Sequence, residues 1–313
     1  MDDQAAELRQ LVRQRATLGA PHRLVAPLVV VSGGKGGVGT TTIAANLAVA
    51  LARQGRRAVF VDADLDHGGH ARWNESSDHG TIVDVLAGRA GAHDVLQRGP
   101  AGIQSICGAW ASGEVSDHAP AAQDRLITEL KHLAPHADLV VVDAGSSRTH
   151  FARRCWQAAT AVIVVTTPDA TAVMNAYAAI KTLARAESRG AVHTLANCAD
   201  DPREGDEIQD RITAACRKFL GTPCSAIGCI PSFEDDCRTG DVLVFPARST
   251  AARALDRVTD TLWAKTQMGA ASLSERLAQQ AIVHGGPLCA SRQDLDIEPL
   301  PKSYGGEPFD TLT

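Results

Sequence analysis

A glycine-rich stretch at residues 33–42 constrains the fold of this chain more than any other feature. Its sequence is GGKGGVGTTT, and it lies between an apolar run at residues 28–31 and a helical pattern that begins at Thr41. A strand that leads through glycines into a helix brings loop N–H groups and the positive helix end to one point. Such a point suits phosphate, so we predict a phosphate-binding loop. A glycine-rich turn without a ligand is the simpler alternative.

The loop departs from the common pattern G-x-x-x-x-G-K-[ST] at one position. Gly34 and Gly39 take the glycine positions and Thr41 takes the hydroxyl position. Thr40 stands where a lysine normally reaches the β- and γ-phosphates. Our predicted nucleotide contacts in the loop are Gly34, Lys35, Gly36, Gly37, Val38, Gly39, Thr40, Thr41 and Thr42.

Strand patterns alternate with helix patterns along most of the chain. This alternation predicts an α/β fold of the P-loop NTPase kind, with a mostly parallel sheet and helices on both faces. We expect a single domain over residues 28–268. The predicted strands are at residues 28–31, 58–61, 139–142, 161–165, 192–196 and 226–230, and the predicted helices at residues 41–53, 125–133, 170–186, 207–219 and 249–266.

Shorter segments flank this domain. Residues 3–18 carry apolar side chains at helical spacing, so residues 1–20 are predicted to form an amphipathic helix. Residues 21–27 are predicted to be a linker. Residues 269–313 become rich in Gly, Ser and Pro, and we expect a tail that is partly disordered, chiefly after residue 285.

Composition narrows the class of protein. The formal net charge is -5 and the isoelectric point is near 6.1, which disfavours bulk nucleic-acid binding. No apolar run approaches the ~18 residues of a membrane span, so we expect a cytoplasmic protein. Eight cysteines fit a reducing compartment. Because the spacing of Cys216, Cys224, Cys229 and Cys237 contains no C-x-x-C pair, a zinc or iron–sulfur site is not expected.

Three aspartates follow predicted strands. Asp62 and Asp64 come at the end of the second strand, and Asp143 ends the run LVVVD. The carboxyl ends of parallel strands meet at the edge of the sheet that carries the phosphate loop. We predict that Asp62 and Asp143 hold Mg²⁺ together with Thr41, and that Asp64 orients an attacking water. A single aspartate here would more often cap a loop.

Two groups of histidines invite a transition-metal interpretation. The first, Asp66, His67, His70 and His79, lies beyond the second strand without a recognisable ligand spacing. The second, His132 and His136, is four residues apart at a predicted helix, but the glutamate of H-E-x-x-H is missing. Solvated loop and helix faces are the preferred interpretation of both.

The form K-G-G-V-G resembles the deviant phosphate loop of the MinD/ParA family of dimerising ATPases. In that family an early lysine, which Lys35 matches, contacts the nucleotide of the partner subunit. The resemblance implies that ATP or ADP with Mg²⁺ is the ligand, that the protein forms a homodimer through nucleotide, and that Lys35 acts with Asp64 in catalysis. It also implies that Asn197, after the fifth predicted strand, reads adenine.

Within this family the chain is most similar to the FlhG group of flagellar-number regulators, also called FleN or YlxH. Residues 3–9 match the element DQAxxLR, and residues 81–88 and 166–181 look like the corresponding FlhG segments. The resemblance covers residues 2–266. It implies that residues 3–9 engage an FlhF-type GTPase, whereas packing of this helix on its own domain is the alternative.

The chain also departs from that family. Thr40 replaces the second lysine, and Ser147 replaces a switch glycine that senses the γ-phosphate. We expect weakened nucleotide binding and a larger loss of turnover, with Lys35 or Arg148 as candidates to compensate. Residues 271–283 carry only Arg276 against Glu275, unlike the basic membrane helix of the family, which argues against membrane recruitment.

Three functions follow as alternatives. The leading one is an ATP-binding, dimerising switch that regulates the number or placement of flagella, or another polar structure, with weak ATP hydrolysis. The second is a non-hydrolysing scaffold, for which Thr40 and Ser147 argue. The third is a positioning protein similar to ParA or CpaE. The net negative charge of the chain argues against the DNA-binding version of this function.

Overall fold

A computed structural model of the chain describes residues 25–65, 80–108, 120–146, 149–185, 190–233, 238–239 and 242–283. The side chains of residues 238–239, 242–243 and 267–283 are outside this description. The chain divides into two compact units, Met1–Ala271 and Ser272–Thr313. In the second unit only the helical backbone of residues 272–283 is described, so the fold below is that of the first unit.

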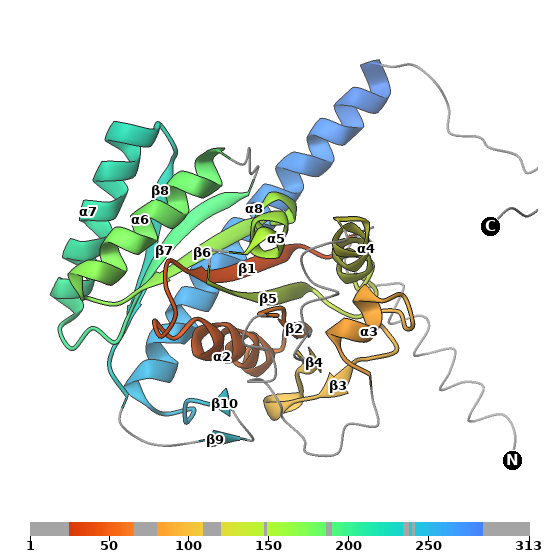
Figure 1. The fold of residues 1–313 in the computed structure, drawn as a ribbon, viewed down its shortest axis with the longest axis horizontal. Coiled ribbons are helices and arrows are strands. Elements are labelled where there is room, and N and C mark those ends of the chain that lie inside the picture. The colour runs from red at the N-terminus through yellow and green to blue at the C-terminus, as the bar shows by residue number, and fades with distance from the viewer. Residues whose placement is uncertain are drawn as a thin grey trace, which may run out of the picture. The chain divides into compact units, whose positions relative to one another are not determined.

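An eight-stranded sheet forms the centre of the first unit, in the order β3-β4-β2-β5-β1-β6-β7-β8 (Figure 1). Every pairing in it is parallel except that of β3 with β4. The strands are β1 (Leu28–Gly33), β2 (Ala58–Asp62), β3 (Gln97–Arg98), β4 (Gln104–Ile106), β5 (Leu139–Ser146), β6 (Ala161–Thr166), β7 (Ala191–Asn197) and β8 (Cys224–Ile230), and a separate pair is formed by β9 (Arg238–Thr239) and β10 (Val242–Leu243).

Helices cover both faces of the sheet. In β1, alternate residues point to opposite faces, so Val29 and Val31 belong to one core and Val30 to the other. Burial on both faces explains why this strand is continuously apolar. One core contains α2 (Thr40–Arg53) and the start of α8 (Thr250–Val283), and the other contains α3 (Ile82–Leu86), α4 (Pro120–Lys131), α5 (His150–Ala158), α6 (Ala170–Arg185) and α7 (Pro202–Leu220).

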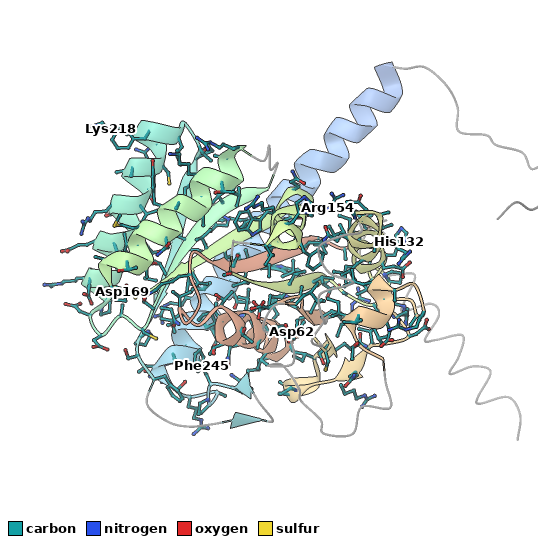
Figure 2. The ribbon with its side chains drawn as sticks, in the orientation of Figure 1. Asp62, His132, Arg154, Asp169, Lys218 and Phe245 are labelled. Carbon is teal, nitrogen blue, oxygen red and sulfur yellow. The ribbon has the colours of Figure 1, made fainter. Side chains whose placement is uncertain are left out.

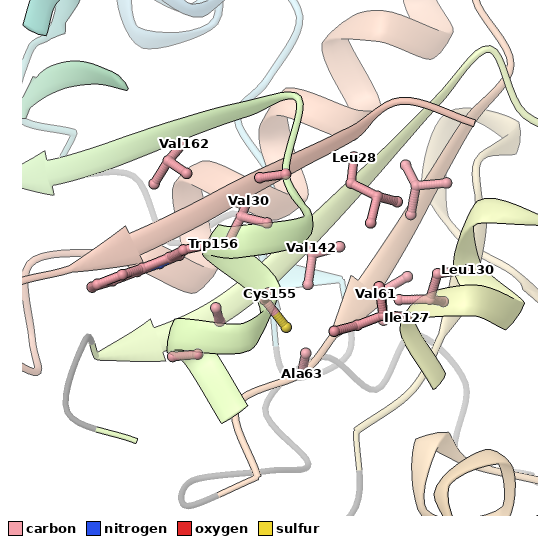
Figure 3. Packing of buried hydrophobic residues seen from close by; sticks show 14 of the residues in the cluster. Leu28, Val30, Val61, Ala63, Ile127, Leu130, Val142, Cys155, Trp156 and Val162 are labelled. Atoms are coloured by element: carbon pink, nitrogen blue, oxygen red, sulfur yellow. The ribbon is translucent and has the colours of Figure 1, made fainter. Parts of the chain in front are cut away.

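Trp156 is the largest side chain with no exposed surface in the second of these cores. It lies with Cys155 on α5, beside Val30, Val142 and other strand residues (Figure 3). Truncation of a buried tryptophan typically costs about 3–5 kcal/mol of unfolding free energy. Helix α5 therefore contributes substantially to the core beneath β1 and β5.

The predicted fold class is confirmed, and all six predicted strands are present. The helix boundaries were less accurate. Helix α4 begins at Pro120, α7 begins at Pro202 and α8 continues to Val283, beyond the predicted end at residue 266. For α7 the missed signal is an Asp-Pro pair, because Asp201 caps the helix by accepting a bond from the N–H of Arg203 at 2.9 Å and Pro202 occupies the first turn.

Helix α5, the short helices α3 and η1 (Pro100–Gly102), and the short strands were not predicted. The predicted helix of residues 1–20 lies outside the described residues. The predicted tail of residues 269–313 is helical up to Val283, and its remainder, residues 284–313, also lies outside them. Across the described part of the chain, none of the helices has both the length and the apolarity that crossing a bilayer requires.

Candidate functional site

The predicted phosphate loop joins β1 to α2 and wraps the first turn of that helix. Gly37 and Gly39 have positive φ angles of 79° and 87°, a conformation that favours glycine. Gly39 is the N-cap of α2, and its carbonyl accepts the first helical bond from the N–H of Ile43 at 2.9 Å. Within the described residues no side chain caps α2. The N–H groups of the first turn are thus available to a ligand in the loop.

Thr40 is the first residue of α2 and is largely buried, with 9% of its surface exposed. Its Oγ1 lies 2.8 Å from the position that a Cβ on Gly33 would occupy, so the hydroxyl packs against the start of the loop. This short side chain supplies no charge to the phosphate position. Retained phosphate binding by the loop in the absence of this lysine stays a prediction.

Lys35 forms an ion pair with Asp169. Asp169, which is labelled in Figure 2, directly precedes α6. The Nζ atom of Lys35 lies 3.2 Å and 3.3 Å from the two carboxylate oxygens. Asp169 also accepts hydrogen bonds from the hydroxyl of Thr167 at 2.6 Å and from the N–H of Ala172 at 2.9 Å. These two bonds, more than Lys35, lower the pKa of Asp169 to about 2. Lys35 is therefore held in its own chain by a residue that sequence reasoning missed.

The predicted metal ligands converge at the carboxyl edge of the sheet. Asp62 on β2 and Asp143 on β5 are register partners, and both are buried. Burial, and then the charge of Asp62, raise the pKa of Asp143 to about 7, whereas hydrogen bonds from Thr41 and from the N–H of Gly145 oppose this rise. The Gly145 bond is 3.1 Å long. Thr41, Asp62 and Asp143 are thus brought together as predicted.

This cluster fits a hard divalent cation. The Oδ2 atom of Asp143 is buried and has no hydrogen-bond partner among the described residues. A buried carboxylate with a neighbouring carboxylate and a raised pKa is stabilised by a cation that offers the missing positive charge. Carboxylate and hydroxyl oxygens are the donors that Mg²⁺ prefers. Thr41, Asp62 and Asp143 would hold it.

Asp64 lies beside the same cluster. Its N–H donates to Oδ1 of Asp62 at 3.3 Å, and a Cβ on Gly145 would lie 2.3 Å from its Oδ2. Gly145 has a φ of 58°. The absence of a side chain at Gly145 therefore makes room for the Asp64 carboxylate. The predicted role of Asp64 in orienting a water stays a prediction.

Asn197, at the end of β7, contacts the loop directly. Its Nδ2 donates to the carbonyl of Val38 at 2.9 Å, and only 5% of the residue is exposed. The predicted contact with adenine stays a prediction. What the structure adds is that Asn197 fixes the loop from β7, the second strand from β1 in the sheet, across 159 residues of sequence.

Several predicted positions lie outside the described residues, namely Asp66, His67, His70, His79, Ser147, Arg148 and Cys237. The helical placement of His132 and His136 was wrong. Helix α4 ends at Lys131, and both histidines lie in the turns between α4 and β5.

Comparison with known proteins bears on the family of this chain. A family model described as an AAA domain matches residues 26–194. The antiactivator FleN of Pseudomonas aeruginosa is 34% identical over 208 residues, which cover 65% of this chain and 73% of FleN. The flagellum site-determining protein YlxH of Helicobacter pylori is 28% identical over 196 residues, and the match spans just under two thirds of YlxH, 65% of its length, and 62% of this chain.

The septum site-determining protein MinD of Bacillus subtilis is 30% identical over 162 residues, which cover 51% of this chain and 60% of that MinD. Among solved structures, MinD of Pyrococcus horikoshii in complex with Mg-ADP superposes with a TM-score of 0.61 at 22% identity, over 76% of this chain and 96% of that one. That structural likeness bears on the fold alone. The chain therefore belongs to the MinD/ParA family of nucleotide-binding proteins, and its resemblance to the FlhG group of that family, which includes FleN and YlxH, is confirmed.

Proposed function

We propose that this protein is an ATP-binding, dimerising switch of the MinD/FlhG type that regulates the number or placement of flagella, or another polar structure. The observation that carries the nucleotide part is the convergence of Thr41, Asp62 and Asp143 beside the loop at the start of α2. The flagellar part is supported by the names of FleN, an antiactivator, and YlxH, a flagellum site-determining protein. We place the protein in the cytoplasm, with peripheral recruitment to the cell pole.

The residues divide the chemistry among them. Loop amides between Gly34 and Thr42 hold the phosphates, while Thr41, Asp62 and Asp143 hold Mg²⁺, which neutralises charge on the β- and γ-phosphates when bound. Asp64 orients the attacking water. Because Thr40 replaces the usual lysine, one phosphate charge has no cationic partner. The lysine would stabilise the transition state more than the bound ATP, so its absence lowers the rate of hydrolysis more than the affinity.

Lys35 is the residue through which we expect ATP to control dimerisation. Its side chain is 35% exposed and pairs with an exposed carboxylate, so the pair can be exchanged for a phosphate at little cost. We expect the natural chain to dimerise with ATP and Mg²⁺, and Lys35→Ala to remain monomeric at the same concentration. Light scattering coupled to size exclusion measures this. Lys181→Ala, which removes an exposed lysine from α6, is the control that should still dimerise.

The partner in this proposal is an FlhF-type GTPase, engaged through residues 3–9. A synthetic peptide of residues 1–20 should accelerate GTP hydrolysis by such a GTPase. A peptide with Gln4→Ala, Leu8→Ala and Arg9→Ala is the matched control. Unchanged turnover with the natural peptide would remove the main support for this partner, without bearing on nucleotide binding by the domain.

A second function, a non-hydrolysing scaffold, is favoured by one observation, the buried threonine at position 40. In that case nucleotide would be structural. ATP turnover that is detectable in the natural chain and vanishes in Asp64→Ala would exclude the scaffold.

A further inference from the structure

Two histidines from different segments meet outside the nucleotide site. His93 lies in the segment between α3 and β3, and His136 lies between α4 and β5. Their Nε2 atoms are 2.6 Å apart, and their rings meet edge to face with centroids 4.0 Å apart. Both residues are exposed. The Nε2 atoms of the two imidazoles therefore lie at contact distance on a surface that is open to solvent.

The turn that carries His93 is fixed on both sides. The N–H of Gly91 donates to Asp94 at 3.0 Å, and the N–H of Ala92 donates to Glu129 of α4 at 3.2 Å. Ala92 itself is buried in the core. His93 is thus presented from a backbone that is bound to α4, the helix that leads to His136.

The segment that carries His136 is fixed as well. Its N–H donates to the carbonyl of Leu133 at 2.8 Å. Arg57 holds the same segment by donating to the carbonyl of Pro135 at 2.8 Å and to the carboxylate of Asp138. Both imidazoles are therefore mounted on ordered backbone, which lowers the entropic cost of binding a shared ligand.

The Nε2 atoms of such an imidazole pair can interact in two ways. One ring can donate an N–H to the other, or both neutral rings can direct lone pairs at one cation. Burial, followed by the charges of His93 and Arg57, lowers the pKa of His136. The neutral imidazole is the form that binds a metal.

We propose that His93 and His136 form a binding site for a divalent transition metal, with Zn²⁺ as the reference ion. Nε2 of a neutral imidazole is a common ligand of Zn²⁺, Cu²⁺ and Ni²⁺. Among the described residues no third His, Cys, Asp or Glu joins the pair in a metal-binding group, so water fills the remaining positions. The bound ion ties the turn before β3 to the segment before β5.

The test is a Zn²⁺ titration of the full-length, untagged chain in a non-thiol reductant. Eleven histidines and eight cysteines make total stoichiometry ambiguous, so the readout is the imidazole resonances of a histidine-labelled sample. We expect the resonances of His93 and His136 to shift together with one dissociation constant. In His93→Ala, the dissociation constant for Zn²⁺ that is read from the His136 resonances should rise by at least about tenfold. In His136→Ala, the constant read from the His93 resonances should rise by the same factor.

His132→Ala is the matched control, because it removes an exposed histidine four residues before His136 and should leave both shifts unchanged. Thermal unfolding without zinc checks that each variant folds. With zinc, the midpoint should rise in the natural chain and in His132→Ala but not in the other two variants. Resonances that do not move, or that move equally in His93→Ala and the natural chain, would overturn the proposal.

Discussion

Thr40→Lys should convert a weak nucleotide binder into a working ATPase. We expect its turnover of ATP to exceed that of the natural chain by at least about 100-fold, in line with the effect of one preorganised charge on a developing negative charge. Affinity should improve less, by roughly 10- to 100-fold, because a charge-assisted contact contributes about 1.5–3 kcal/mol. Steady-state phosphate release and equilibrium binding of a fluorescent ATP analogue measure the two effects.

The structure makes this gain plausible on geometric grounds. Thr40 begins α2 directly after Gly39, and Asp62 and Asp143 are register partners at the adjacent edge of the sheet. The loop, the predicted metal ligands and Asp64 therefore lie together beside position 40, where a lysine would add the missing charge. Lys35, the nearest candidate to compensate, is bound to Asp169.

Two further variants separate charge from shape. Thr40→Met adds a long side chain without a charge and should stay as slow as the natural chain. Adding Asp64→Ala to Thr40→Lys should remove the gained turnover while leaving the gained affinity. Equal, robust hydrolysis by the natural chain and by Thr40→Lys would show that Thr40 does not limit the reaction.

The parts of the site that could be predicted are those that a local sequence pattern of a few residues indicates. The β1–loop–α2 unit follows from glycines placed between an apolar run and a helical pattern. The meeting of Asp62 with Asp143 follows from the rule that parallel strands end at one edge, although the two are far apart in sequence. Regular elements and their carboxyl ends carry this information.

Contacts between loops could not be predicted in this way. Lys35 meets Asp169 across 134 residues, and His93 meets His136 across 43 residues, through side chains that no periodicity specifies. Helix α5 was missed because nine residues with two arginines give a short, weakly apolar pattern, and its capping residue, Thr149, gives only a local signal. Such pairs depend on how turns are packed, which one sequence does not reveal.

Gly34→Ala should be the most damaging conservative change in the loop. A Cβ on Gly34 would lie 2.2 Å from the carbonyl carbon of Asn175 and 2.4 Å from the nitrogen of Ala176. These are backbone atoms of α6, so they cannot move aside as a flexible side chain would. Either the loop or the helix must shift, and overpacking of this kind costs about 1–3 kcal/mol or somewhat more.

The close approach of Gly34 to α6 also couples stability to function, because α6 begins just after Asp169, the partner of Lys35. We therefore expect Gly34→Ala to lower the unfolding free energy by about 3 kcal/mol in urea and to weaken ATP binding by more than tenfold. Gly36→Ala is the matched control: no atom lies within 4 Å of its added Cβ, so its unfolding free energy should change by less than about 0.5 kcal/mol. If the two variants unfolded at the same urea concentration, the contact between the loop and α6 would not be the constraint on position 34. A stable Gly34→Ala that still failed to bind ATP would instead assign this glycine to the phosphates alone.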